Sequence, residues 1–374
     1  MRRAALCAGV LVAACGGSLP GGWVYVTAVT SNAASVVWTA ARPADAVRCR
    51  GAAGETVEGT TTATRRGLRV TRLEGLAAAR AYRCTIGPRR IHFRTAPAGN
   101  QPFTFAVVGD TGDGSPAAAA LARRIRAGRP AFLIHLGDLA YGHGGAALLE
   151  ARFFRPYRRT LARIPLFSTP GNHDLHGRSV YTAVFPPAAP AGSHDGLLYA
   201  FEWGAAHFVS ASYRDVAGGG AAGRWVADDL RAARARPWRI LFLHEPPYSP
   251  GQKYVAPGLR AALVPILEAG AVDLLLTGHQ HFYAHAEPFC EHGPGPGVLE
   301  VISGGGGENL DPPAVRPNFP RVVSVTHYLR VRVTDEALDV RAVDVRGHVF
   351  DHVRRARNAP AACRSEGWPP PRER

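Results

Sequence analysis

From residue 103 onward, the sequence contains five short apolar runs, and each is followed within a few residues by side chains that can bind a metal ion. The runs cover residues 103–108, 132–136, 166–169, 240–243 and 272–276. The side chains that follow them are, in order, Asp110, Asp138, Asn172 with His173, His244, and His279 with His281. Such runs are typical of buried parallel strands, whose carboxyl ends meet at one edge of an α/β sheet. The pattern therefore predicts an α/β domain that gathers these side chains at that edge.

These side chains supply carboxylate, amide and imidazole donors, a mixed set that suits iron, zinc and manganese. The plainer interpretation is a series of turns and caps, because a Gly-Asp pair after a strand often only begins a turn. A lone Gly-His-x-His is a moderate signal. Five such groups in order, each after an apolar run, are too many for turns alone, so the sequence predicts a metal site.

The same residues resemble the signature of the calcineurin-like metallophosphoesterases, in the version found in purple acid phosphatases. That family's pattern is GDxG, GDxxY, GNH(D/E), a histidine after a strand, and GHxH. The matching segments are Gly109-Asp110-Thr111-Gly112, Gly137-Asp138-Leu139-Ala140-Tyr141, Gly171-Asn172-His173-Asp174, His244-Glu245-Pro246-Pro247-Tyr248 and Gly278-His279-Gln280-His281. The resemblance covers essentially the whole mature chain. It implies an acid phosphatase that hydrolyses small phosphate monoesters by attack of a metal-bound hydroxide.

The resemblance also implies a role for each residue of the motifs. Asp138 would bridge two ions; Asp110, Tyr141 and His281 would bind the first, and Asn172, His244 and His279 the second. Two ions about 3.5–4 Å apart activate a shared water and hold the phosphoryl group. His173 and Asn172 would contact the substrate phosphate, and His173 would help to protonate the leaving group.

Tyr141 separates the purple acid phosphatases from other metallophosphoesterases, because its phenolate binds ferric iron in that family. The alternative is a packed aromatic side chain one turn beyond Asp138. With Tyr141 as a ligand, the resemblance implies Fe(III) paired with Fe(II), Zn or Mn.

The chain departs from the family beyond the fourth motif. Gln252-Lys253-Tyr254 occupies the region where a further histidine is expected, so Lys253 or Tyr254 would contact the phosphate, or this loop carries no function. His285 stands where the family often has an acidic residue, and we interpret it as a supporting or exposed side chain. His135, on the second apolar run, is expected to be buried or to support the site.

Two other functions remain open at this point. A phosphodiesterase or nucleotide phosphohydrolase could use the same ligand set, because loops outside the motifs shape the substrate pocket. A surface binding protein with an inert metal domain is the other alternative, and the intact set of ligands argues against it.

The first 18 residues have the features of an export signal. Arg2 and Arg3 precede an apolar segment that is too short to span a bilayer. Leu11-Val12-Ala13-Ala14-Cys15 resembles a bacterial lipobox, in which Cys15 would carry lipid; the alternative is an ordinary secretory signal. We therefore expect an exported protein, either a bacterial cell-envelope lipoprotein or a periplasmic or secreted protein. Any contact with a membrane would come through this lipid anchor.

Four further cysteines remain after the signal, an even number that is consistent with an oxidising compartment. They are Cys49, Cys84, Cys290 and Cys363. Proximity along the chain favours the pairs Cys49–Cys84 and Cys290–Cys363, although three pairings are possible.

The 374 residues divide by their patterns into domains. Residues 22–96 alternate β-formers with turn residues and resemble the fibronectin type III-like sandwich found in many purple acid phosphatases. Residues 102–353 form the expected α/β metallophosphoesterase domain, for which the family implies two mixed sheets packed face to face between helices. Within it, residues 322–349 are expected to form antiparallel strands. Residues 354–374 are rich in Arg and Pro and are expected to form a poorly ordered tail unless Cys363 holds them.

The formal net charge is +15, with 44 Lys and Arg against 29 Asp and Glu. This charge would suit an anionic partner. The arginines are scattered along the sequence, however, and arginine and alanine are enriched together, as a GC-rich genome would produce. We therefore predict no specific nucleic-acid partner. The sequence does not indicate an oligomeric state.

Overall fold

The computed structural model describes residues 22–39, 46–63, 67–186, 197–293, 295, 297–312, 316–357, 363–368 and 373. The predicted export signal at residues 1–18, with Cys15, lies outside these ranges. Within them, no helix combines the length and the apolar character that a membrane span requires.

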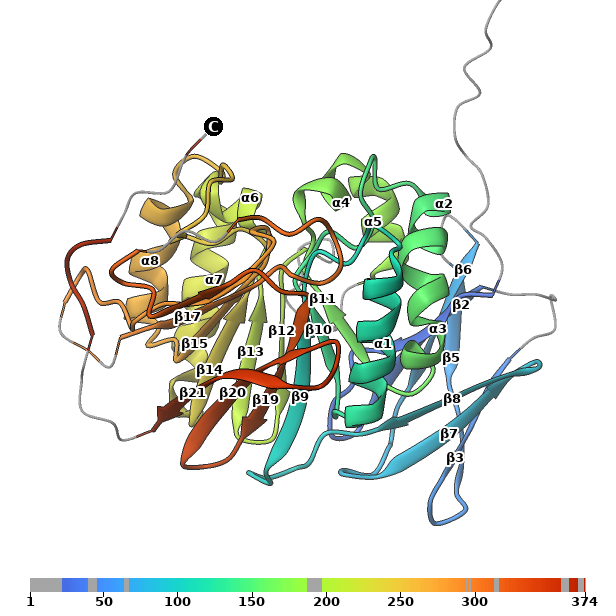
Figure 1. Cartoon of the computed structure of the whole chain (residues 1–374). Coiled ribbons are helices and arrows are strands. Elements are labelled where there is room, and N and C mark those ends of the chain that lie inside the picture. Colours follow the sequence, from blue (N-terminus) through green and yellow to red (C-terminus); the bar gives the residue numbers. More distant parts are fainter. Residues whose placement is uncertain are drawn as a thin grey trace, which may run out of the picture.

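The described residues between 22 and 96 form a sandwich of two four-stranded antiparallel sheets (Figure 1). The first sheet has the order β1 (Val24–Thr27), β2 (Ala34–Thr39), β6 (Leu68–Leu73), β5 (Thr60–Ala63). The second has the order β4 (Thr56–Glu58), β3 (Val47–Gly51), β7 (Ala81–Ile86), β8 (Arg89–Arg94). One apolar core joins the sheets, with Trp38 on one side and Tyr82 on the other. This strand order is that of an immunoglobulin-like sandwich, consistent with the expected fibronectin type III-like domain.

The α/β domain contains two mixed sheets that face each other. The smaller has the order β11 (Leu166–Ser168), β10 (Leu133–His135), β9 (Phe103–Val108), β19 (His327–Val333), β20 (Ala337–Asp344), β21 (Val349–Ala356). The larger has the order β12 (Tyr199–Trp203), β13 (Ala206–Ser210), β14 (Trp238–Phe242), β15 (Leu274–Thr277), β17 (Leu299–Ser303), β16 (Tyr283–His285), β18 (Arg321–Val323). Buried aromatic rings fill the space between them, and Phe105 lies 5.3 Å from Phe208 between ring centres. The predicted fold class is confirmed.

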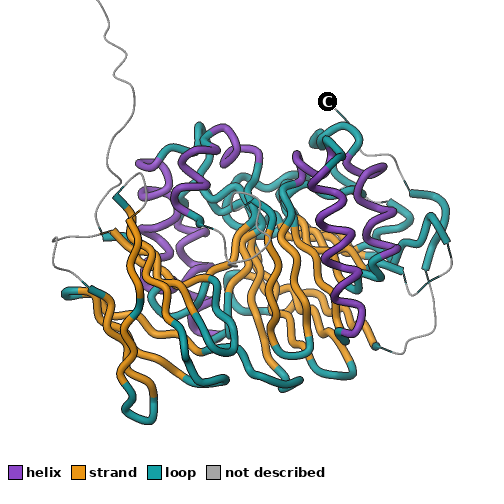
Figure 2. Tube along the Cα trace, turned by 180° about the vertical axis from the view of Figure 1, so that it is seen from behind, coloured by secondary structure: helices purple, strands orange, loops and turns teal. Residues whose placement is uncertain are grey.

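Helices flank the two sheets (Figures 1 and 2). Beside the smaller sheet lie α1 (Pro116–Gly128), α2 (Ala146–Leu149), a π-helical turn (Glu150–Phe154), α3 (Arg155–Leu161), α4 (Asn172–His176) and α5 (Arg178–Val184). Beside the larger sheet lie α6 (Tyr213–Ala217), α7 (Ala221–Ala232), a 3-10 turn (Ala233–Ala235) and α8 (Leu259–Ala269). Helix α1 begins with a serine cap: Ser115 Oγ accepts a hydrogen bond from the backbone N–H of Ala118 at 3.1 Å, and Pro116 lies in the first turn.

Strand β1 attaches the sandwich to the helices beside the smaller sheet. Trp23 stacks on Phe154 with ring centres 4.2 Å apart, and its indole N–H donates to Glu150. Tyr25 donates its hydroxyl hydrogen to the backbone carbonyl of Val184. Because these aromatic side chains are buried at the junction, the two domains share one packed interface.

The described C-terminal residues are attached to the α/β domain through Cys363, the exception that the prediction of a poorly ordered tail allowed. The expected boundary after residue 353 falls inside β21, which pairs with β20 as far as Ala356. Residues 363–368 are held against the domain by the Cys290–Cys363 disulfide and by Trp368, which is 6% exposed and packs on Tyr248. The sequence indicates the attachment through Cys363 but not the packing of Trp368. The other disulfide joins Cys49 to Cys84, which lie opposite each other on β3 and β7.

One buried histidine links the larger sheet to α7. His207 Nδ1 lies 2.8 Å from Glu202 Oε1, and its Nε2 lies 2.6 Å from Asp229 Oδ2. Burial opposes the charged imidazole, but the hydrogen bonds to the carboxylates of Asp229 and Glu202 outweigh it and raise the pKa of His207 to about 9. The protonated form therefore stabilises the fold.

We expect this stabilisation to be complete below pH 6.5, the ordinary pKa of histidine, and to be lost as the pH rises through about 9. His207→Gln should lower the free energy of unfolding by about 2 kcal/mol at pH 6, since it removes hydrogen bonds to charged groups. The difference from the unaltered protein should shrink toward pH 9 in urea titrations. His352→Gln, which removes a more exposed His–Asp pair, is the control and should change the stability little. A constant difference across this pH range would contradict the assignment.

Candidate metal centre

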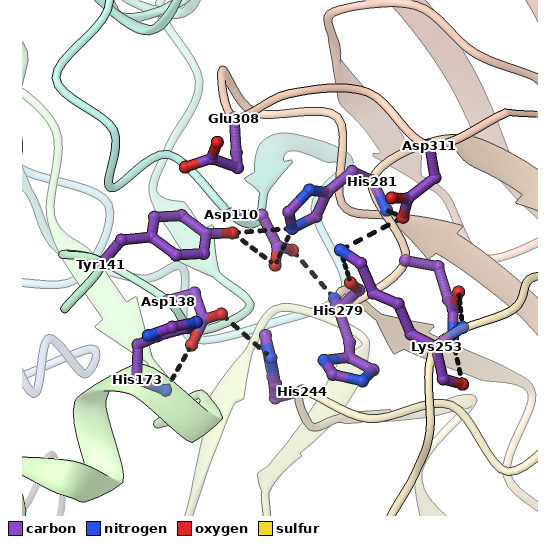
Figure 3. Close-up of polar contacts among 12 residues, drawn as sticks. Asp110, Asp138, Tyr141, His173, His244, Lys253, His279, His281, Glu308 and Asp311 are labelled. Atoms are coloured by element: carbon purple, nitrogen blue, oxygen red, sulfur yellow. Dashed lines mark hydrogen bonds and ion pairs between the residues drawn. The ribbon is translucent and has the colours of Figure 1, made fainter. Parts of the chain in front are cut away.

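The loops that follow the parallel strands bring the sequence-predicted residues to one edge of the two sheets (Figure 3). Asp110 follows β9, Asp138 follows β10, and His244 follows β14. Asn172 and His173 open α4 after β11, while His279 and His281 follow β15. Strands β9, β10 and β11 are parallel to one another, and so are β13, β14, β15 and β17. Their carboxyl ends therefore face the same edge, as the pattern of the sequence predicts.

Three of these residues adopt left-handed backbone conformations that are unusual outside glycine. The φ angles of Asp110, Asp138 and His279 are 60°, 55° and 66°. Each such residue costs of order 1 kcal/mol or more and persists only when its surroundings impose it. Here Asp110 donates its N–H to Gly137 O, and His279 donates its N–H to Asp110 Oδ2. The backbone is thus bent so that the side chains converge.

Two carboxylates lie buried at the centre of the cluster. Asp110 is 0% and Asp138 2% exposed, and with His244 they offer donor atoms that all lie within 4.8 Å of one another. Burial and the charge of Asp110 raise the pKa of Asp138. Burial also opposes ionisation of Asp110, but His244 and His281 lower the pKa of its carboxyl. Two buried carboxylates this close need a compensating positive charge.

Each of the three imidazoles is held by a backbone carbonyl on the side away from the cluster. His244 Nδ1 lies 2.8 Å from Leu136 O, His281 Nδ1 lies 2.8 Å from Asn309 O, and His279 Nε2 lies 2.7 Å from Tyr254 O. A carbonyl can only accept, so the nitrogen facing it carries the hydrogen. The other nitrogen of each ring then presents a lone pair to the cluster, which is the arrangement that metal-binding histidines use. The residues present therefore fit a metal centre.

The inward contacts divide the side chains into two groups. Tyr141 Oη lies 2.8 Å from His281 Nε2 and 3.2 Å from Asp110 Oδ1. On the other side, Asn172 Oδ1 lies 3.1 Å from both His244 Nε2 and His279 Nδ1. Asp138 lies between the groups, with Oδ2 3.5 Å from His244 Nε2.

His173 and Lys253 stand at the rim. The backbone N–H of His173 donates to Asp138 Oδ1 at 2.9 Å, and its ring lies with Nδ1 3.3 Å from Gly142 O. Lys253 Nζ donates to His279 O at 2.8 Å and forms an ion pair with Asp311 at 3.1 Å. Partial burial lowers the pKa of His173. Both side chains are therefore held beside the cluster without occupying its centre.

Two aspartates that sequence reasoning did not assign support the centre. Asp174 is 2% exposed and accepts hydrogen bonds from the backbone N–H groups of Asp138, Leu139 and Gly171. It thereby ties the second motif to the third; its place in the quoted GNH(D/E) pattern was the available signal. Asp311 accepts from the N–H of His281 as well as from Lys253. No feature of the sequence pointed to Asp311, because it lies outside the motifs.

The structure also shows the surroundings of His135 and His285. His135 is fully buried with Nε2 2.8 Å from Thr111 Oγ1, and burial lowers its pKa to about 3. It supports the loop after β9, in agreement with the expectation. His285 does not join the site: it lies on β16 with Nδ1 2.8 Å from Asp351 Oδ2, beside Tyr283.

Comparisons with known proteins agree with this geometry. Residues 103–283 match the model of the calcineurin-like phosphoesterase family. The chain is 30% identical to human acid phosphatase type 7 over 297 residues, which is 66% of each chain. It is 27% identical to purple acid phosphatase 21 of Arabidopsis thaliana over 256 residues, covering 64% of this chain and 58% of the relative.

The solved structure of a purple acid phosphatase from yellow lupin seeds has the same fold. Its TM-score is 0.77 at 18% identity, and the match covers 89% of this chain and 74% of the lupin chain. The match covers 58% of the Arabidopsis protein, so this chain spans less than two thirds of that relative's length.

Metal ions that bind only the folded state should raise the melting temperature by mass action. Adding Zn²⁺ or Mn²⁺ to the metal-stripped protein should therefore raise Tm. A stabilisation of about 2 kcal/mol would raise it by about 5 °C. Asp138→Ala should abolish this rise and the bound metal measured by mass spectrometry. Asp228→Ala, an exposed carboxylate on α7, is the matched control and should keep both. Two ions retained by Asp138→Ala would rule out the proposed centre.

Proposed function

This chain belongs to the purple acid phosphatases of the calcineurin-like phosphoesterase family, and we propose that it hydrolyses phosphate monoesters at a site holding two metal ions. The observation that carries this proposal is the set of three imidazoles whose outer nitrogens donate to backbone carbonyls. The inner nitrogens of His244 and His281 face the buried carboxylates of Asp138 and Asp110, and that of His279 faces the side-chain oxygen of Asn172. Such a set is suited to metal binding, and without a cation its buried carboxylates would lower the stability of the fold.

The two contact groups support the ligand assignment implied by the family. Asp110, Tyr141 and His281 would hold one ion, and Asn172, His244 and His279 the other, with Asp138 between them. A phenolate beside a carboxylate favours a ferric ion in the first position, with Fe(II), Zn or Mn in the second. When bound, such a pair would polarise the phosphoryl oxygens and lower the pKa of a water molecule.

The surrounding residues would bind the substrate and transfer protons. The backbone N–H of His173 donates to Asp138, and its ring lies at the rim of the cluster. With Nδ1 facing the carbonyl of Gly142, the other ring nitrogen points away from that carbonyl, and it can protonate a leaving oxygen when the ring is in its charged form, which acidic pH favours. Asn172 would assist in holding the phosphate. Lys253, the only lysine in the sequence, would supply the positive charge that related enzymes obtain from histidine.

The reaction is tested by comparing an aryl phosphate monoester with its diester on metal-loaded protein from about pH 4 to 9. A monoester preference with an acidic optimum is expected. A diester preference, or an optimum at or above neutrality, would assign the site to a phosphodiesterase or nucleotide phosphohydrolase instead. Loss of the visible absorption band in Tyr141→Phe would identify the tyrosine as a ferric ligand. No turnover of either ester by metal-loaded protein would leave only the binding-protein alternative.

Lys253→Met should raise KM for the monoester by about tenfold or more, since a hydrogen bond between charged groups contributes about 1.5–3 kcal/mol. The effect on kcat should be smaller, because the lysine is proposed to hold the phosphate in both ground and transition states. Lys253→Arg keeps the charge and should restore most of the affinity. An unchanged KM in Lys253→Met, with metal content intact, would show that the loop carries no substrate contact.

We also propose that the protein is exported, and two disulfides support an oxidising compartment. Lipidation of Cys15 would anchor it in the cell envelope. The expected result is membrane association of the full chain that Cys15→Ser abolishes; an equally soluble distribution of both proteins would favour the ordinary secretory signal.

A further inference from the structure

Arginines that are scattered along the sequence gather in a groove between the two domains. The groove has a volume of about 1230 Å³ and is lined by β7 and β8 of the sandwich, the C-terminal end of α1, and α3 with the loop after it. The sandwich wall contributes Arg83, Arg90 and Arg94. The opposite wall contributes Arg126, Arg129, Arg159 and Arg163. We call this the arginine groove.

A second hollow of about 650 Å³ continues the arginine groove toward β19 and β20. The two share Arg94 and Arg129, and the second adds Arg330, Arg332 and Arg341. The carboxylate that lines this extension is Asp339, which already lies 3.0 Å from His352 and 3.7 Å from Arg354. No acidic side chain lines the larger part. The hollows therefore form one elongated surface of positive charge.

The charge in the arginine groove is uncompensated within the protein. Among the residues that the structure describes, none of its arginines forms an ion pair with a carboxylate, and most are exposed. Arg83 on β7 also lies directly between Arg50 on β3 and His92 on β8. Like charges opposite each other in a sheet are destabilising. Partial burial, Arg163 and Arg83 together lower the pKa of His92, as expected in a positive field.

The arginine groove is separate from the metal centre. It lies at the C-terminal end of α1, whereas the loop before α1 carries Asp110. The 13 residues of α1 span about 20 Å, so roughly that distance separates the groove from the centre. In Figure 1, β7 and β8 lie low in the view while α4, which begins at the site, lies at the top.

The shape and lining of the groove restrict what could occupy it. Guanidinium groups bind phosphate through two parallel hydrogen bonds. The aromatic residues of the walls, Tyr82, Phe93, Phe103 and Trp203, are at most 9% exposed, so the groove offers no platform on which nucleobases could stack. Duplex DNA is excluded as an occupant because proteins read it with elements that project into its grooves, not with a hollow. A lipid bilayer is excluded because a flat surface would not enter a concave one. A slender, flexible chain of phosphates fits the groove, because it pairs with guanidinium groups, needs no aromatic stacking and can enter a concave surface.

We propose that the arginine groove binds linear inorganic polyphosphate. The ligand lies along the groove with its phosphates paired to arginines from the sandwich, α1 and α3. Binding at this site does not depend on the proposed hydrolysis, because the metal centre is at the opposite end of α1.

The test uses the full chain and long-chain polyphosphate labelled at one end with a fluorophore, with binding followed by anisotropy. The combined substitution Arg94→Gln, Arg129→Gln and Arg163→Gln removes one charge from the sandwich wall and two from the opposite wall. It should weaken binding by about 30-fold or more, and affinity should fall steeply as salt rises, as for other phosphate polymers. Because these arginines have no ion pair to lose, the variant should melt no lower than the unaltered protein.

Arg224→Gln, Arg234→Gln and Arg321→Gln remove the same charge from exposed positions away from the groove and form the matched control. This control should weaken binding by no more than a few-fold. The Asp138→Ala variant should bind polyphosphate with unchanged affinity. This result would show that the polyphosphate is bound in the groove and not at the metal centre. Equal losses in the two triple variants would overturn the proposal in favour of general charge attraction. So would the absence of binding, or tighter binding of a single-stranded oligonucleotide with the same number of phosphates.

Discussion

The burial of two carboxylates, Asp110 and Asp138, at the edge of two sheets is the constraint on which the rest of the structure depends. Burial opposes their ionisation, and their proximity to each other adds to the cost. Both sit in left-handed backbone conformations that a chain free to relax would avoid. The parallel strands impose these conformations, because they end at this edge and the loops that follow them converge there. A site of this kind is stable only when positive charge is placed inside it, which is why its architecture and the proposed chemistry cannot be separated.

The imidazoles show how the fold prepares such a site before any ligand enters. Each ring is oriented by a carbonyl from a different part of the chain: the end of β10 for His244, the loop near residue 254 for His279, and the loop near residue 309 for His281. Asp174 gathers three backbone N–H groups from two motifs, and Asp311 connects His281 to Lys253. The donors are thus oriented by groups that would never bind the metal themselves. Such outer contacts fix the tautomer of each histidine and hold its lone pair in position.

Charge is distributed in the opposite way at the two ends of α1. At its N-terminal end, buried carboxylates require cations; at its C-terminal end, arginines from the sandwich and the α/β domain lie together without acidic partners. The sandwich contributes one wall of this basic surface, and it is fixed to the helices through the aromatic side chains of Trp23 and Tyr25. This gives the N-terminal domain a physical role beyond that of a spacer. Its relation to the rest of the chain determines which arginines meet.

The sequence by itself determined the fold class, the convergence of the motif residues and the start of α1, because each depends on local pattern. Apolar runs ending in polar residues specify buried parallel strands, and Ser115-Pro116 specifies a helix start. Tertiary structure alone decided the rest. The packing of Trp368 and the roles of Asp174 and Asp311 depend on contacts between distant segments, as does the partner of His285. The arginines illustrate the difference most clearly: scattered along the chain, they resemble a compositional bias, and only packing brings ten of them from β7, β8, α1, α3, β19 and β20 around one groove. Periodicity and spacing describe neighbours along the chain, whereas an electrostatic surface depends on neighbours in space.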